Sequence, residues 1–160
     1  MAIIGRATPR SAAGIARVYV ETWRSTYAGM LPDQVLLAMG PERQRNEWLR
    51  QIQSQSPGFR VIVAAEIGEG VVGFVSCGLS AWGDEMGLGR GGSAVVGEIF
   101  TLYVLPDFQG NGIGRQLLLA AFQALRESGA EQAMVWVLRD NPNRYFYEAM
   151  GGRVAAERQS

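Results

Sequence analysis

"EIFTLYVLPDFQGNGIGRQLL", from Glu98 to Leu118, is the stretch that decides the fold. Its first half is rich in β-branched and aromatic residues, and it predicts a strand that ends at Pro106. Its second half opens a long helical pattern whose apolar stripe runs on to Leu125. Three glycines in "QGNGIG" join the two halves. This order predicts a tight turn that leads directly from a strand into a helix.

The glycine turn has the features of an anion site. The first N–H groups of a helix lack partners within the helix, and together with the positive end of the helix dipole they attract negative charge. Glycine lets a phosphate group approach the main chain closely, and Arg115 follows with a positive charge. A tight turn without a ligand has the same spacing, so the spacing alone leaves both interpretations open.

The rest of the chain changes between helical and strand periodicity without an internal repeat. The pattern predicts an α/β (α+β) fold with a mixed sheet, in a single domain over residues 1–160. Strands are expected over 1–7, 59–67, 71–80, 94–105, 131–139 and 153–158, and helices over 11–27, 30–40, 41–53, 112–128 and 141–151.

Composition excludes several classes of function. The net charge is zero and no cluster of cations marks a nucleic-acid site. No apolar run approaches the roughly 18 residues that a membrane span needs, and the first residues do not read as a signal peptide. With Cys77 as the single cysteine, no internal disulfide can form, so we expect a cytoplasmic protein.

Two missing residue types narrow the chemistry further. The chain has no histidine, and all fifteen of its cations are arginine. A Ser-His-Asp triad, a Schiff-base lysine and a Walker A lysine are therefore excluded, and no metal site is expected. Proton transfer is left to Asp, Glu, Tyr, the lone Cys or water.

Three segments together resemble the GCN5-related N-acetyltransferase (GNAT) superfamily. The turn matches the family's Q/R-x-x-G-x-G/A signature at Gln109, Gly112 and Gly114. "DNPNRYFYEAMGG" resembles the segment that follows the family's fifth strand, and "ETWRSTYAGMLPD" resembles the entry helices of many members. The three matches come in the family's order and span nearly the whole chain.

The resemblance implies a GNAT-like, V-splayed mixed sheet with acetyl-CoA in the cleft between strands four and five. It implies that the main chain at Leu102, Tyr103 and Val104 holds the pantetheine arm. It also matches Asn141 to a family asparagine that contacts CoA. The pyrophosphate would be held by the main-chain amides of Gln109, Gly110, Asn111, Gly112, Ile113, Gly114 and Arg115.

Acetyl transfer to an amine requires a base and an acid. A primary amine with a pKa near 10.4 must lose a proton before it attacks, and the departing thiolate is expelled more easily when it is protonated. Glu98 matches the glutamate that many members use as the base, and Tyr147 matches the tyrosine that protonates the thiolate. From the residues alone, Glu98 could instead face solvent at a sheet edge, and Tyr147 could simply pack in the core.

The expected activity is therefore the transfer of an acetyl group from acetyl-CoA to a primary amine, by direct attack in a ternary complex. A non-catalytic acyl-CoA-binding sensor is the first alternative, and a binder of nucleotide phosphates without a P-loop lysine is the second. In the family, the acceptor enters between the first helices and the fourth strand. There the wall would be lined by Trp23, Tyr27, Met30 and Leu31, for which ordinary core packing is the other interpretation.

The C-terminal end departs from the family pattern. Nine residues follow Gly151, which is enough for one strand where members commonly have a hairpin of two. An open sheet edge invites pairing with another chain. We therefore expect a homodimer in which the partner covers this edge.

Overall fold

The computed structural model describes residues 2–27, 32, 34, 40–54, 58–80, 95–135 and 147. The predicted helices over 30–40 and 141–151 and the strand over 153–158 lie largely outside this part of the chain, although Tyr147 is helical. The single domain, the homodimer and the cytoplasmic location stay predictions. The described elements are β1 (Ile3–Arg6), α1 (Ala12–Tyr27), α3 (Pro41–Ile52), β2 (Arg60–Glu66), β3 (Gly70–Leu79), β4 (Val96–Val104), α4 (Ile113–Glu127) and β5 (Gln132–Val135).

The strands form one mixed sheet in the order β1-β2-β3-β4-β5. The first three pairs are antiparallel and β4 pairs with β5 in parallel. A parallel pair needs a crossover connection, and α4 supplies it between β4 and β5. The predicted mixed sheet with flanking helices is therefore confirmed. None of the described helices is long and apolar enough to pass through a membrane.

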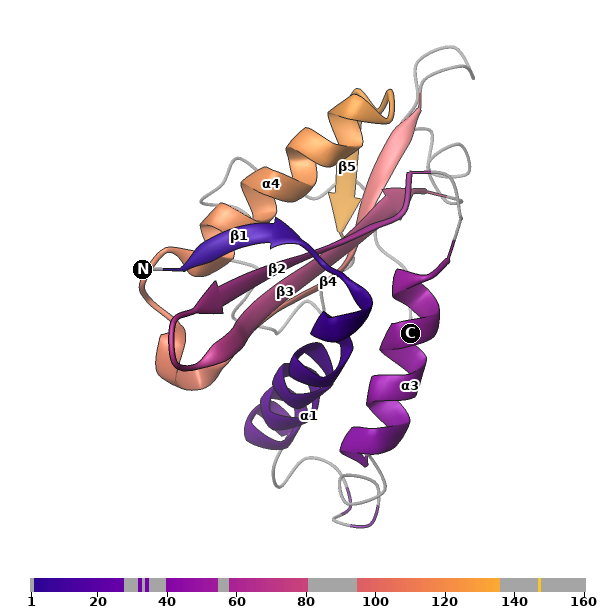
Figure 1. Ribbon diagram of the computed structural model, residues 1–160. Helices are drawn as coiled ribbons and strands as arrows, with labels where there is room; N and C mark the ends of the chain where they lie inside the picture. The colour runs from indigo at the N-terminus through magenta and orange to yellow at the C-terminus, as the bar shows by residue number, and fades with distance from the viewer. Residues whose placement is uncertain are drawn as a thin grey trace.

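Strand β3 lies at the centre of the molecule. Helices α1 and α3 lie on one side of the sheet and α4 on the other (Figure 1). Because helices cover both faces, the seven consecutive residues from Val72 to Gly78 are all buried. This double burial explains why β3 reads as a nearly continuous apolar run rather than as an alternating one.

Helix α4 packs very closely on β4. Leu117, Leu118 and Leu125 of the helix are buried, and each contributes about 1.5–3 kcal/mol through the apolar surface it removes from water. Gly97 makes the close approach possible, because a Cβ atom there would stand 2.7 Å from Leu125 Cδ1. Gly97 therefore faces α4, and its neighbour Glu98 must face the side of α1 and α3.

Strand β4 changes its pairing at Phe100. On the β3 side, Ile99 pairs with Cys77 and Thr101 pairs with Ser76, so Phe100 is an extra residue that forms a β-bulge. On the other side, pairing with β5 runs from Val96 to Ile99 and stops there within the described residues. The second half of β4 therefore pairs with β3, and the described part of β5 ends at Val135.

We expect Gly97→Ala to destabilise the protein by about 1–3 kcal/mol, the usual range for overpacking a core. The added methyl group would force Leu125 and the helix away from β4. Urea denaturation measures this loss as a lower midpoint with an unchanged slope.

Gly5→Ala is the matched control, because a Cβ atom at Gly5 on β1 meets nothing within 4 Å. It should change stability by less than about 0.5 kcal/mol. Equal stability of the two variants would contradict the close packing of α4 on β4.

Candidate functional site

The predicted glycine turn connects β4 to α4. A short 3-10 turn, Pro106–Phe108, follows the strand, and α4 begins at Ile113. Gly110 and Gly112 have φ values of 83° and 81°, in the left-handed region that favours glycine. Neither has an atom within 4 Å of a hypothetical Cβ, so their backbone angles, rather than crowding, require glycine here.

The turn presents a row of unpaired amides. Within the described residues, no main-chain N–H from Gly110 to Arg115 donates a hydrogen bond to a main-chain carbonyl, and Gln116 is the first to bond back, to Gly112. Gly112 caps the helix without a side-chain hydrogen bond. Free amides at the positive end of a 15-residue helix form an anion-binding surface. The structure thus gives the predicted anion site the necessary local geometry.

Gln109 ties this turn to the strand. Its side-chain Nε2 donates to the main-chain oxygen of Val104 at 2.9 Å. The side chains of Asn111 and Arg115 are exposed, so both are accessible to a ligand. Since Val104 ends β4, the hydrogen bond holds the glycine turn next to the end of the strand.

The second half of β4 contains the residues predicted to hold the pantetheine arm. Leu102, Tyr103 and Val104 are half-buried. The ring of Tyr103 packs edge-on against Tyr19 of α1, with centroids 5.6 Å apart. Its side chain is therefore engaged in the core, and its main chain remains the part that can pair with a ligand as another strand would.

Glu98 is buried, with 7% of its surface exposed. The interpretation as a solvent-facing carboxylate at a sheet edge is therefore wrong, because β3 and β5 flank it on both sides: its register partners are Gly78 and Met134. Ser80 Oγ donates to Glu98 Oε1 at 3.0 Å. This hydrogen bond orients the carboxylate on the face of the sheet that α1 and α3 cover.

Tyr147 is half-buried and packs against the main hydrophobic core. Burial raises the pKa of its phenol to about 12, because the charged phenolate is poorly solvated there. The group therefore keeps its proton throughout the neutral and moderately alkaline range, as a proton donor must.

The single cysteine is a buried residue of the hydrophobic core. Cys77 is fully buried in the centre of β3. Burial raises the pKa of its thiol to about 11, although the positive charge of Arg60 lowers that pKa in part. A thiol that stays protonated and inaccessible is a poor nucleophile. Among the described residues, no group of three or more His, Cys, Asp or Glu side chains is placed to hold a metal ion.

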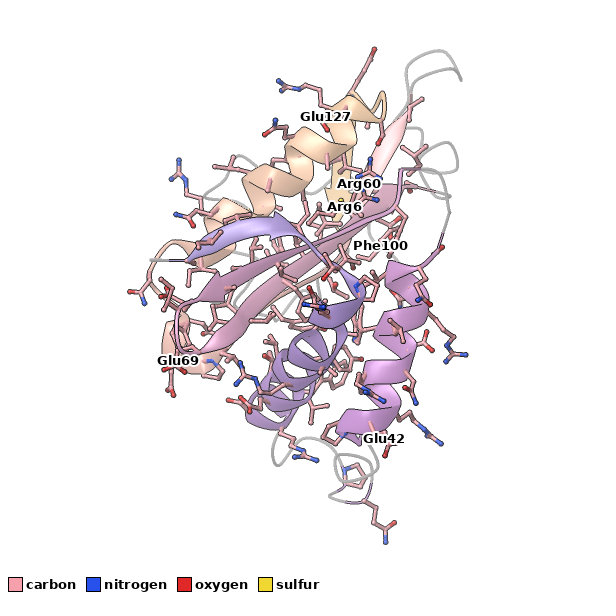
Figure 2. All side chains as sticks on the ribbon, in the orientation of Figure 1. Arg6, Glu42, Arg60, Glu69, Phe100 and Glu127 are labelled. Carbon is pink, nitrogen blue, oxygen red and sulfur yellow. The ribbon has the colours of Figure 1, made fainter. Side chains whose placement is uncertain are left out.

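A cavity of about 540 Å³ lies between α3 and the sheet, on the face that Glu98 shares. Phe100, the bulged residue of β4, is 45% exposed and projects toward the C-terminal end of α3 (Figure 2). The cavity is lined by Tyr19, Gln44, Glu47, Trp48, Gln51, Phe59, Ser76, Gly78, Leu79, Phe100 and Thr101.

Of the predicted acceptor wall, the structure describes the side chain of Trp23, which lies beside this cavity. Trp23 is half-buried and packs on Tyr19 with ring centroids 5.8 Å apart, and Tyr19 is the member of that pair that lines the cavity. The side chain of Tyr27, and all of Met30, Leu31 and Asn141, lie outside the described residues. Their roles stay predictions.

The sequence analysis did not predict that α3 lines this cavity. Gln44, Glu47, Trp48 and Gln51 are spaced at three, four and seven residues, which places them on one face of a helix. Such a stripe of one large aromatic residue among polar ones could have marked a cavity-facing helix.

Three comparisons with known proteins bear on this site. The chain matches the sequence profile of the Acetyltransferase (GNAT) family across residues 15–151. It is 29% identical over 144 residues to YuaI, an uncharacterized N-acetyltransferase of Bacillus subtilis, covering 89% of this chain and 75% of that protein. It is also 33% identical over 132 residues to an uncharacterized N-acetyltransferase of Archaeoglobus fulgidus, covering 82% of this chain and 79% of that one.

The fold matches solved structures as well. The crystal structure of the PaiA N-acetyltransferase from Thermoplasma acidophilum, in complex with coenzyme A, superposes with a TM-score of 0.73. The match covers 95% of this chain and 89% of that one at 20% sequence identity. At that identity, the likeness concerns the fold.

We expect Gly112→Ala to weaken the binding of coenzyme A about tenfold. An alanine at φ 81° strains the backbone by roughly 1–2 kcal/mol, and relief of that strain would turn the amides of the loop away from the anion. Isothermal titration calorimetry with coenzyme A measures the change.

Gly68→Ala is the matched control, since Gly68 has a φ of 84° and open space around it but lies in the turn between β2 and β3. It carries the same strain and should leave coenzyme A affinity unchanged. If both variants bind coenzyme A as the parent does, the loop is not the anion site.

Proposed function

Because this chain belongs to the GNAT family of acetyltransferases, we propose that it moves an acetyl group from acetyl-CoA to a primary amine within a ternary complex. One observation carries the proposal: β4 leads through a glycine turn to a row of amides at the start of α4 that donate to no main-chain carbonyl within the described residues. The helix start suits a pyrophosphate, and the main chain of a strand suits the amides of a pantetheine arm.

The pyrophosphate would lie on the amides between Gly110 and Arg115, with the Arg115 side chain as an additional cation. The pantetheine arm would then follow β4 back from Val104 toward Phe100, pairing with the main chain of the strand. This path ends the arm at the bulge, two residues from Glu98. The thioester is thereby brought close to a buried carboxylate.

Glu98 is the proposed base. An amine acceptor arrives mostly as the ammonium ion at neutral pH, because its pKa is near 10.4. The Glu98 carboxylate, held by the Ser80 hydroxyl, takes the ammonium proton directly or through water. The free amine nitrogen then attacks the carbonyl carbon of the thioester.

Tyr147 is the proposed acid. As the tetrahedral intermediate collapses, the carbon–sulfur bond breaks and its electron pair leaves with the sulfur of CoA. Tyr147 donates its phenolic proton to that sulfur, and the positively charged nitrogen loses its second proton through water to the tyrosinate, which yields the amide, free CoA and a reprotonated Tyr147. Cys77 carries no acyl group in this scheme, because its thiol is buried and protonated.

An acyl-CoA-binding sensor without turnover is the alternative. It would use the same loop and strand edge but would have no need for a carboxylate in the apolar interior. Burying a carboxylate is costly unless its hydrogen bonds are restored, so the buried Glu98 favours the catalytic proposal. Release of free CoA thiol over a panel of amines separates the two, since a sensor would bind acetyl-CoA and release none.

Tyr147→Phe should lower turnover about tenfold or more, the usual contribution of a general acid. With a phenol pKa of about 12, the parent enzyme should show no loss of rate from this group until the pH approaches that value. Stopped thiol-release assays from pH 6 to 10 measure both effects. Unchanged turnover with intact acetyl-CoA binding would exclude this role for Tyr147.

Glu98→Gln should lower turnover about 10- to 100-fold at pH 7, with a deficit that shrinks as the pH rises toward the pKa of the amine. The glutamine oxygen still accepts from Ser80, so the packing is preserved while the base is lost. A pH–rate profile with one amine measures this pattern.

Glu127→Gln is the control, because Glu127 is exposed near the far end of α4 (Figure 2). It should behave as the parent enzyme does at every pH. A Glu98→Gln deficit that is absent, or that is the same at every pH, would contradict the role of Glu98 as a base.

A further inference from the structure

We infer that the acceptor is a primary amine on an aromatic or otherwise apolar arm that carries no anionic group, and that the cavity between α3 and the sheet holds this arm. This inference rests on the proposed acetyl transfer and names its acceptor class. The cavity, at about 540 Å³, lies within the range of small-molecule sites.

Aromatic rings form most of the cavity's apolar wall. Tyr19 and Trp48 contact each other edge-on with centroids 6.0 Å apart, and Phe59 and Phe100 pack with centroids 6.1 Å apart. Leu79 adds an aliphatic side chain. These rings come from both the helical layer and the sheet, so a flat or apolar group between them would contact rings on two sides.

The polar groups of the cavity are almost all neutral. Gln44 and Gln51 project from α3, and the hydroxyls of Ser76 and Thr101 lie 2.5 Å apart on the sheet. One hydroxyl donates to the other, and the pair forms a neutral floor. Amide groups at the α3 side can bind neutral polar atoms of an acceptor.

Glu47 is the one charged side chain among the described residues that line the cavity. It pairs with Arg50 on the solvent side and accepts a long hydrogen bond from Gln51 Nε2 at 3.5 Å. An ammonium ion entering here meets a carboxylate and aromatic rings, both of which attract cations. A phosphate or carboxylate group would meet that negative charge with no cation in the described lining.

Trp48 is a well-packed part of the cavity wall. The residue is 3% exposed, and its ring packs edge-on against Phe74 of β3 with centroids 4.9 Å apart. The ring therefore offers apolar surface to an acceptor molecule.

The cavity also lies next to Glu98, the proposed base. Phe100 and Thr101 follow Ile99, where the pairing of β4 with β5 ends. Gly78, opposite Glu98 in the register, lines the cavity, and a Cβ atom there would stand 3.0 Å from Phe100 Cε2. An arm held in the cavity can therefore extend its amine toward Glu98.

Rates of CoA thiol release test the acceptor class directly. With phenethylamine as the probe for an apolar arm and glucosamine 6-phosphate as the probe for an anionic amine, we expect kcat/KM to be at least tenfold higher for phenethylamine. Equal values, or a preference for the phosphorylated amine, would overturn the inference.

Two variants test the role of the cavity's charge. Glu47→Gln and Arg50→Gln abolish the same ion pair but change the charge at the cavity in opposite directions. We expect Glu47→Gln to weaken phenethylamine binding about two- to fivefold, in the range for partly exposed charges, and Arg50→Gln to strengthen it or leave it unchanged. If both variants weaken binding equally, the effect is structural and the inference fails. Glu42→Gln, at the opposite end of α3 (Figure 2), should match the parent.

Calorimetric titration of phenethylamine into protein saturated with CoA separates this inference from the proposed function. Binding that depends on Glu47, without thiol release from acetyl-CoA, would support the acceptor class and contradict acetyl transfer. Thiol release with glucosamine 6-phosphate that Glu47→Gln leaves unchanged would support acetyl transfer and overturn the acceptor class.

Discussion

The proposed site depends on one strand and the turn that follows it. Strand β4 pairs with β3 from Gly97 to Val104, with a bulge at Phe100, and with β5 from Val96 to Ile99. Between these two strands it carries the buried carboxylate of Glu98, and after Val104 the chain leads to main-chain amides at the start of α4 that have no main-chain acceptor among the described residues. A strand's main chain can pair with an extended ligand and free amides at a helix start can bind an anion, so the proposed cofactor site uses both.

Close packing holds the parts of this site in position. Because Gly97 has no side chain, Leu125 of α4 packs directly against the main chain of β4, and this contact positions the helix relative to the strand. Gln109 ties the loop to the strand at Val104, and Ser80 orients Glu98. The glycine turn, the second half of β4 and the Glu98 carboxylate are thus all held by contacts to β4 or its neighbours.

The sequence predicts the parts of the site that depend on local chemistry. Glycines with positive φ, followed by an amphipathic helix, predict the turn between β4 and α4, because few other residues adopt those angles. The burial of Glu98 was less accessible to prediction, since a strand's pattern does not say which edges are paired. The bulge at Phe100 depends on the register against β3, and the cavity depends on how α3 packs across the sheet. Both are products of tertiary structure, which a single sequence does not reveal.

The most direct test of this account is hydrogen exchange of the main-chain amides with and without acetyl-CoA. Bound acetyl-CoA should protect the amides from Gly110 to Arg115, together with amides of Phe100–Val104 in β4 that do not pair with β3. ADP, which carries a pyrophosphate but no pantetheine arm, should protect the loop and leave the strand unchanged. Acetyl-CoA that binds by calorimetry but protects neither segment would contradict the central claim that β4 and the start of α4 form the cofactor site.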